Sequence, residues 1–125
     1  MILPEIISKE PLGPVVRSGD VEWFNIARWT YFALLAAEEL GVTSANVDDM
    51  LGSDNPEIRR LLGVEGDFGG PIGLTADWAY RAIKHVGNYS EIYERHVGPS
   101  TELALERGLN ALWTDGGIQY AMPIR

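Results

Sequence analysis

The chain has 125 residues and carries 10 Lys and Arg against 18 Asp and Glu, which gives a net charge of -8. This charge repels phosphate backbones and anionic lipid headgroups, and no basic run forms a local exception, so no nucleic acid is expected as a partner. Cysteine is absent, which excludes a disulfide framework, a thiolate metal site and a cysteine nucleophile. With 46% hydrophobic residues, residues 1–125 are expected to form a single domain with a real core.

The amino terminus does not have the pattern of an export signal. Pro4 and Glu5 interrupt its apolar residues, so no basic region is followed by a sustained apolar run. The longest uncharged apolar stretch, 29–37, falls well short of the ~20 residues that span a bilayer. We therefore expect a soluble chain with no signal peptide and no membrane insertion.

Residues 1–19 are predicted to form an extended arm. Two short apolar segments, around 2–7 and 13–17, are joined by a Pro- and Gly-rich kink, which is typical of short strands. Extended backbone needs a partner strand for its N–H and C=O groups, and no later segment reads as a clear sheet. The arm therefore resembles the middle of a larger structure.

A long helix is predicted directly after the arm. Asp20 is the expected N-cap, Glu22 lies in the first turn, where negative charge is favourable, and Gly41 ends the helix. Its apolar residues are Trp23, Phe24, Ile26, Ala27, Trp29, Tyr31, Phe32, Leu34 and Leu35. These side chains cover much more than one stripe, so most sides of the helix must be covered. It is either a central core helix or an interface helix.

The middle of the chain predicts two short helices and a loop. Thr43 or Ser44 can cap a helix that ends at Leu51, and an Asn-Pro pair opens a second helix over 58–62. Residues 63–74 are rich in glycine and predict a flexible loop. This loop has neither a preceding strand nor a Lys-Ser/Thr pair, so it is not expected to bind phosphate.

Two more helices are predicted between residues 75 and 97. Thr75 can cap the first, which carries apolar residues at helical spacing and ends before Gly87. The second follows at once over 89–97. Together with the long helix, these two helices predict that residues 20–125 form a helical body.

A last helix is predicted near the carboxyl end, capped by Ser100 or Thr101. Its predicted apolar face consists of Leu105, Leu109, Leu112 and Trp113. A Gly-Gly turn then leads into an extended tail over 118–125. No sequence repeat and no low-complexity tract is present.

Two groups of residues resemble metal ligands. Acidic residues gather between 48 and 57, but they do not follow the ligand spacing of an EF-hand loop and are better explained as helix caps and solvated charges. His85 and His96 lie near the ends of different predicted helices, without a carboxylate at metal-ligand spacing. We therefore predict no metal site and no cofactor.

Two glutamate pairs resemble the carboxylates of a glycosidase. Glu91 and Glu94 lie on one predicted helix, and Glu102 and Glu106 lie on another. Pairs on exposed helix faces usually serve solvation, so neither pair is assigned a catalytic role. The chain is predicted not to be an enzyme, it has no assigned catalytic residue, and its ligand-binding residues remain unknown.

Three segments carry recognisable motifs in order. Residues 7–20 read ISKEPLGPVVRSGD, residues 87–98 read GNYSEIYERHVG, and residues 108–125 read GLNALWTDGGIQYAMPIR. In this order they resemble the periplasmic amino-acid-binding proteins of ABC transporters. The third segment resembles in particular the subgroup for general L-amino-acid uptake.

The resemblance implies that only the carboxyl-terminal portion of such a protein is present. The expected fold class is α+β and mainly helical, with short amino-terminal strands, a long apolar helix and several short helices, as in the carboxyl-terminal part of lobe one of a type II periplasmic-binding fold. The family contacts L-amino acids and an ABC transporter membrane component, which implies a periplasmic location.

The order of the motifs also places the family's ligand residues before Met1. In the family, an arginine and backbone amides hold the ligand carboxylate, and an acidic residue holds its ammonium. None of these residues is carried over to this chain. We therefore expect a fragment or truncated form that does not bind an amino acid on its own.

Two alternatives come from other functional classes. The chain can be a stand-alone helical interaction module that dimerises through its amino-terminal arm and its Trp-rich first helix. For the truncated form too, we expect a homodimer in which residues 1–17 of each chain contact the other, because unpaired strand edges and aromatic surfaces recruit partners. A carbohydrate-active enzyme would instead need two of the paired glutamates to face one cleft.

Overall fold

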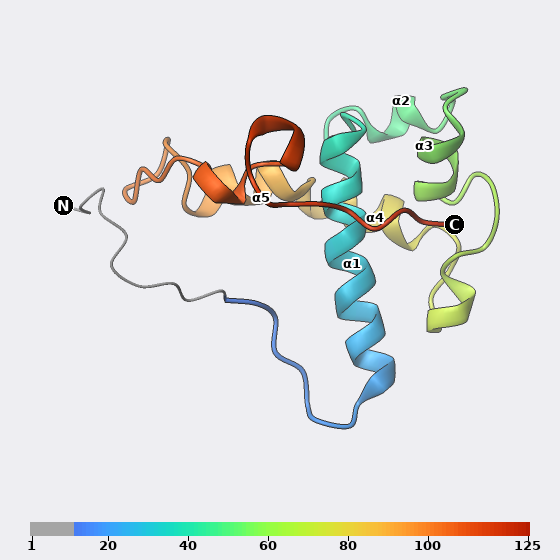
Figure 1. The fold of residues 1–125 in the computed structure, drawn as a ribbon. Helices are drawn as coiled ribbons and strands as arrows, with labels where there is room; N and C mark the ends of the chain where they lie inside the picture. Colours follow the sequence, from blue (N-terminus) through green and yellow to red (C-terminus); the bar gives the residue numbers. More distant parts are fainter. Residues whose placement is uncertain (1–11) are drawn as a thin grey trace.

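The computed structural model describes residues 12–125, which form a mainly helical unit with no strand in that range (Figure 1). The longest element is α1, Val21–Glu39. The other elements are α2 Val47–Met50, α3 Pro56–Leu61, η1 Gly70–Ile72, α4 Trp78–Val86, α5 Tyr89–His96, η2 Gly108–Asn110 and η3 Trp113–Asp115, where η denotes a single 3-10 turn.

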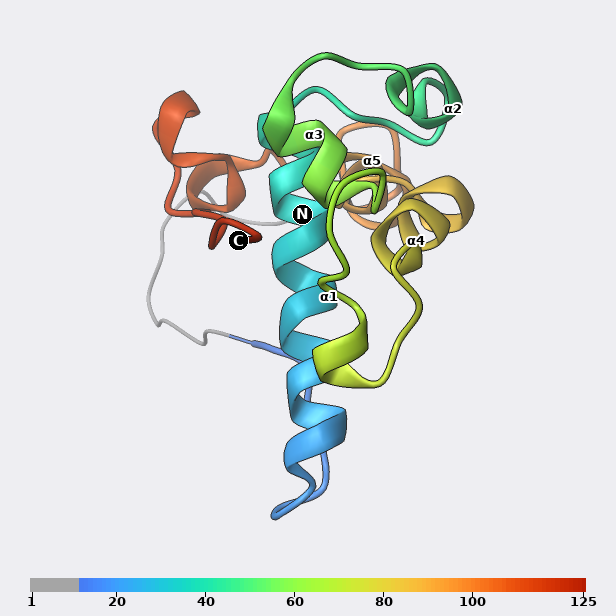
Figure 2. The same cartoon turned by 90° about the vertical axis from the view of Figure 1, so that its right-hand side faces the viewer.

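The shorter elements surround one half of α1. Helices α3, α4 and α5 pack against it. The views of Figures 1 and 2 together place α4 and α5 on one side of α1 and the end of the chain on the other. Residues 107–125, here called the strap, contain η2 and η3 and then cross α1 as an extended segment (Figure 1).

Side-chain caps define where the helices begin. Asp20 Oδ1 accepts a hydrogen bond from the N–H of Trp23 at 2.9 Å, as its predicted role as N-cap of α1 requires. Asn55 Oδ1 accepts from the N–H of Glu57 at 2.9 Å, and Pro56 is the first residue of α3. These starts were predictable because each cap acts within three residues.

The core forms where the carboxyl-terminal half of α1 meets the other helices. All buried residues of α1 lie between Ala33 and Ala37. The remaining buried apolar residues are Val42, Val47, Ile58, Leu61, Leu62, Trp78, Ala79, Ile83, Leu112 and Ala121. The carboxyl-terminal half of α1 is therefore a core helix. Its amino-terminal half is partly exposed, and its use as an interface stays a prediction.

The predicted amino-terminal strands are not supported. The first, around 2–7, lies outside the described residues. The second, around 13–17, is irregular backbone that ends in a turn at Ser18 and Gly19. A strand needs a neighbour for its hydrogen bonds, and residues 12–125 offer none beside this segment. The prediction of a mainly helical fold is confirmed, whereas the β component is not.

The predicted helix after Ser100 is wrong. Ala104 and Gly108 both adopt a positive φ, 47° and 48°, which a continuous right-handed helix does not allow. The N–H of Leu105 instead bonds back to the carbonyl of Val97 at 3.0 Å. The residues with this apolar spacing fold in short turns instead of a helix, and Leu112 is buried in the core.

The predicted flexible loop, 63–74, contains η1 and a close backbone crossing. A Cβ atom on Gly63 would lie 2.1 Å from the carbonyl oxygen of Ala76, so this position admits only glycine without movement. The flexibility of the loop stays a prediction. Among residues 12–125, no helix is both long enough and apolar enough to cross a membrane.

Candidate functional site

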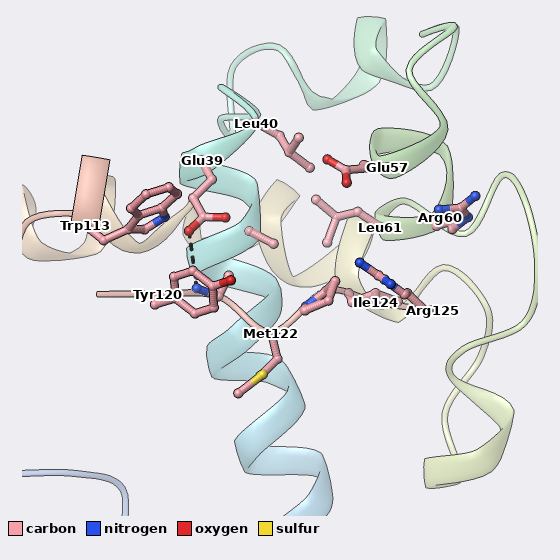
Figure 3. Close-up of a pocket in the computed structure, with 13 residues that line it drawn as sticks. Glu39, Leu40, Glu57, Arg60, Leu61, Trp113, Tyr120, Met122, Ile124 and Arg125 are labelled. Carbon is pink, nitrogen blue, oxygen red and sulfur yellow. Dashed lines mark hydrogen bonds between the residues drawn. The ribbon is translucent and has the colours of Figure 1, made fainter. Parts of the chain in front are cut away.

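A pocket of about 230 Å³ lies between the strap, α1 and α3 (Figure 3). Helix α1 contributes Glu39 to its wall, and α3 contributes Glu57 and Arg60. The complete lining is Ala36, Glu39, Leu40, Glu57, Arg60, Leu61, Trp113, Tyr120, Ala121, Met122, Pro123, Ile124 and Arg125. The end of the chain therefore forms one side of the pocket.

The pocket combines aromatic surface with charges of both signs. The rings of Trp113 and Tyr120 pack with their centroids 5.7 Å apart at one end (Figure 3). Glu39 Oε1 accepts a hydrogen bond from the N–H of Ala121 at 3.3 Å. Arg60 and Arg125 make no ion pair with any residue of 12–125. Such a lining suits a small polar molecule, but the volume of the pocket is below the roughly 300–1,000 Å³ of usual ligand sites.

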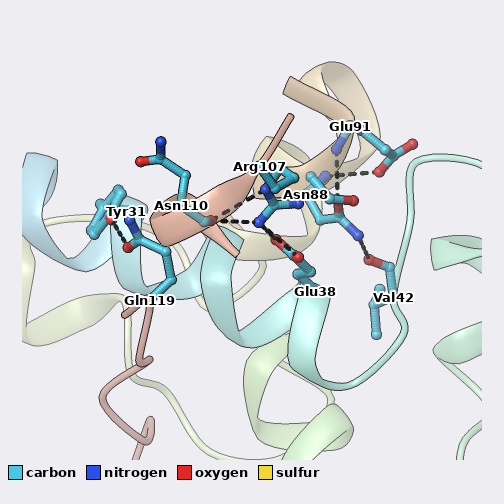
Figure 4. Close-up of polar contacts among 9 residues, drawn as sticks. Tyr31, Glu38, Val42, Asn88, Glu91, Arg107, Asn110 and Gln119 are labelled. Carbon is cyan, nitrogen blue, oxygen red and sulfur yellow. Dashed lines mark hydrogen bonds and ion pairs between the residues drawn. The ribbon is translucent and has the colours of Figure 1, made fainter. Parts of the chain in front are cut away.

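The strap is attached to α1 by an ion pair between Arg107 and Glu38 (Figure 4). Arg107 Nη2 donates to Glu38 Oε1 at 3.0 Å and to Oε2 at 3.2 Å, and it also donates to the carbonyl of Asn110 at 2.8 Å. The guanidinium lies 5.3 Å from the ring centroids of both Tyr89 and Tyr93, a geometry that adds cation–π attraction. Arg107 thus joins three parts of the fold.

Burial controls the titration of this junction. It raises the pKa of the Glu38 carboxyl above its ordinary value, and the charge and hydrogen bonds of Arg107 only partly oppose this effect. Burial also raises the pKa of the Tyr31 hydroxyl, which donates a hydrogen bond to Gln119 of the strap. At this junction the charges of Glu38 and Arg107 are paired with one another.

A second polar junction fixes the start of α5 (Figure 4). Asn88 Oδ1 accepts from the N–H of Glu91 at 3.0 Å, and Glu91 Oε2 accepts from the N–H of Asn88 at 2.8 Å, which completes a capping box. Asn88 Nδ2 donates to the carbonyl of Val42 at 2.9 Å, and Ser44 Oγ donates to Glu91 Oε1 at 2.6 Å. Burial raises the pKa of Glu91, but these hydrogen bonds outweigh it and hold the pKa below its ordinary value.

The residues that resembled metal ligands are dispersed. His85 and His96 are exposed at the ends of α4 and α5. Asp48 pairs with Lys84 and accepts a hydrogen bond from Tyr80 at 2.9 Å. Within residues 12–125, no three His, Asp or Glu side chains are grouped to hold a metal ion.

The structure gives the four glutamates of the two pairs different surroundings. Glu91 belongs to the capping box, while Glu94 Oε1 accepts from the N–H of Ser100 at 3.2 Å. Glu102 and Glu106 are both exposed. Sequence reasoning missed the structural role of Glu91, although an Asn three residues before a Glu is a signal that could have shown it.

Sequence reasoning also missed the Arg107–Glu38 pair. The two residues are 69 positions apart, and no local spacing links them. A single cationic residue in an irregular segment gives no sign of its partner, so only the tertiary structure could reveal this contact.

Comparisons with known proteins agree with these observations. No family model matches the chain. The general L-amino acid-binding periplasmic protein AapJ of Rhizobium johnstonii is 61% identical over the whole chain, and the glutamate/glutamine/aspartate/asparagine-binding protein BztA of Rhodobacter capsulatus is 60% identical. The chain spans 37% of the length of each of these curated relatives.

A solved structure gives the same result for the fold. It is an ABC transporter periplasmic binding protein from Brucella ovis with glutathione bound, and it matches 98% of this chain with a TM-score of 0.93 and 56% identity. This chain covers 39% of that protein. By sequence and by fold, the chain is therefore similar to part of the periplasmic amino-acid-binding proteins of ABC transporters. The resemblance of its three motifs to that family is confirmed.

Proposed function

We propose that this chain is the carboxyl-terminal portion of a periplasmic solute-binding protein that serves amino-acid import by an ABC transporter. Its whole length is 58–61% identical to such proteins, and this observation carries the proposal. The full-length protein would bind solute and deliver it to the membrane component of the transporter, rather than catalyse a reaction. The L-amino acids named for the relatives, and the glutathione in the Brucella ovis structure, indicate the class of ligand.

We also propose that the chain does not bind an amino acid by itself. The pocket beside the strap is small, and the chain represents only 37% of the length of the relatives. Binding of a zwitterion needs donors for its carboxylate and acceptors for its ammonium within one enclosed site. The pocket beside the strap has charges of both signs in its lining, but its volume of about 230 Å³ is below that of usual ligand sites.

A segment exchange tests the role of the chain. The matching part of AapJ is replaced by residues 1–125, and the binding of L-amino acids and glutathione is measured by isothermal titration calorimetry. We expect the chimera to bind at least one ligand of unaltered AapJ within about tenfold of its affinity, since a fully shared fold changes few contacts. A chimera with native circular dichroism but no binding to any ligand of AapJ would refute the proposal.

The same calorimetry on the separate chain tests the proposal that this chain does not bind an amino acid by itself. We expect no saturable heat with any of these ligands at millimolar concentration, and no thermal shift, because a ligand stabilises only the state that it binds. A micromolar dissociation constant for any of them would contradict the proposed lack of binding.

The alternative, a dimerising interaction module, rests on one observation. The amino-terminal half of α1 exposes large apolar side chains, among them Trp23 and Phe24. Of the expected contact residues 1–17, residues 1–11 lie outside the described part of the chain. Light scattering at tens of micromolar tests this alternative, since a homodimer has twice the mass of 13.8 kDa, and deletion of residues 1–12 should abolish it.

A further inference from the structure

A second hollow, of about 150 Å³, lies on the other side of the end of the strap. Ile124 and Arg125 line both this hollow and the pocket beside α3. Its apolar wall comes from α1, from the loop that contains η1 and from α4, and includes Trp29, Phe68, Ile72 and Trp78. Figure 1 shows the end of the chain and this loop on the same side of α1. Because three of its lining residues are aromatic, the hollow is here called the aromatic pocket.

Local contacts hold the shape of the aromatic pocket. A Cβ atom on Gly69 would lie 2.7 Å from Cδ1 of Trp78, so the backbone of the loop packs directly against this indole ring. The N–H of Ile72 donates to the carbonyl of Gly69 at 3.0 Å, and the N–H of Gly70 donates to Asp67 Oδ1 at 2.8 Å. Trp78 itself is buried in the core. The pocket is therefore formed without a ligand, as is usual for sites that bind small molecules.

The size and the lining of the aromatic pocket favour a single flat ring. An apolar cavity of about 150 Å³ binds benzene. The rings of Trp29, Phe68 and Trp78 can meet another ring through edge and offset-stacked contacts, which an aliphatic group of the same size cannot make. The apolar part of the occupant is therefore expected to be one aromatic ring.

The charge at the aromatic pocket favours a carboxylate on that ring. Among the described residues that line it, Arg125 alone is charged. Arg125 makes no ion pair with any residue of 12–125, although the chain has 18 Asp and Glu. A guanidinium group binds a carboxylate through two parallel hydrogen bonds. Arg60 lines the adjoining pocket and adds positive charge near the same end of the chain.

We propose that the aromatic pocket is a binding site for small aromatic carboxylates. The ring lies among Trp29, Phe68 and Trp78, and the carboxylate binds Arg125. An α-amino acid fits this site less well, because its ammonium would lie close to Arg125 and the described lining offers no carboxylate to accept from it. The site is separate from the amino-acid binding of the full-length protein, which the AapJ chimera tests.

Titration of residues 1–125 with sodium benzoate at neutral pH tests the site. The indole N–H signals are followed by proton–nitrogen NMR, since Trp29 and Trp78 line the pocket whereas Trp23 and Trp113 do not. We expect saturable shifts of the Trp29 and Trp78 signals with a Kd of about 1 mM or tighter. Benzamide has nearly the same shape without the charge and should bind at least about fivefold more weakly. L-Phenylalanine should give no saturable shift.

Two variants of equal charge show whether Arg125 holds the carboxylate. Arg125→Gln should raise the Kd for benzoate about fivefold or more, because the ligand loses its charged partner. Arg81→Gln is the matched control, since Arg81 is exposed on α4 and lies outside the lining of the pocket. It should change the Kd by less than about twofold, because salt screens distant charges. Phe68→Leu removes one ring and should also weaken binding, while circular dichroism checks that the fold is retained.

Several results would overturn the aromatic pocket as a carboxylate site. These are the lack of any saturable shift at about 20 mM benzoate, equal affinity for benzamide and benzoate, and equal weakening by Arg81→Gln and Arg125→Gln. A shift of the Trp113 signal alone would place benzoate in the pocket beside α3 and would also contradict the proposal. Each of these results leaves amino-acid binding by the AapJ chimera unaffected, so the two proposals fail independently.

Discussion

Asn88 is a buried position at which a single substitution removes several polar contacts at once. It is the only buried polar residue of the described chain, at 3% exposure. Asn88→Ala removes the acceptor for the N–H of Glu91 and the donor to the carbonyl of Val42. Loss of an N-cap costs about 0.5–2 kcal/mol, and a buried carbonyl without its partner costs about 1–3 kcal/mol. We expect a combined loss of about 1.5–5 kcal/mol, the sum of the two contributions.

Urea denaturation followed by tryptophan fluorescence measures this loss. Asn88→Asp separates the two contributions, because aspartate retains the capping acceptor but has no N–H to donate to Val42. It also places a second carboxylate beside Glu91, so it should destabilise the fold even though it is a good capping residue. Ser90→Ala, which removes only a hydroxyl bonded to Asn88 Oδ1, should cost less than about 1 kcal/mol. A loss below about 0.5 kcal/mol for Asn88→Ala would refute this account of the junction.

Three further predictions concern the same fold. The folded-state pKa of Glu91 is lowered, so its charge stabilises the fold above the ordinary carboxyl pKa, and this contribution disappears as pH falls through the lowered value. Glu91→Gln should therefore be less stable at neutral pH and lose less stability than the unaltered chain from about pH 6 to about pH 3, whereas an identical pH profile would contradict this. Leu35→Ala should lower the free energy of unfolding by ~2–5 kcal/mol in urea denaturation, because Leu35 is 1% exposed. Phe32→Ala should cost less, because Phe32 is only half-buried. A larger loss for Phe32→Ala than for Leu35→Ala would show that the buried face of α1 is wrongly assigned. Arg107→Lys keeps the charge but loses the paired geometry, so amide exchange in residues 111–119 should become faster while α4 is unchanged; unaltered exchange would mean that Arg107 does not hold the strap.

The features that the sequence predicted well are local. Asp20 and Asn55 were recognised as caps because each bonds to an N–H two or three residues away, and Gly87 was recognised as a helix end. Three motifs in order also predicted the family, which the comparisons confirm. In all these cases the information lies within a short window of residues.

The errors arose where distant contacts override local pattern. Apolar spacing after Ser100 predicted a helix, but the positive φ values at Ala104 and Gly108 allow Leu112 to reach the core. The strand predicted around 13–17 has no neighbour among the described residues. Local preference is worth only tenths of a kcal/mol per residue, so burial and long-range pairing decide such segments.

The sequence by itself determined the helices that are capped locally, the absence of cysteine chemistry, the strongly acidic charge and the resemblance to amino-acid-binding proteins. Only the tertiary structure decided which half of α1 is buried, that Arg107 pairs with Glu38, and that the strap forms a pocket with α3. The physical reason is that a cap involves neighbours along the chain, whereas burial and ion pairing depend on which distant segments share space. Apolar residues cover most of the circumference of α1 in the sequence, and only packing selects the end that the core covers.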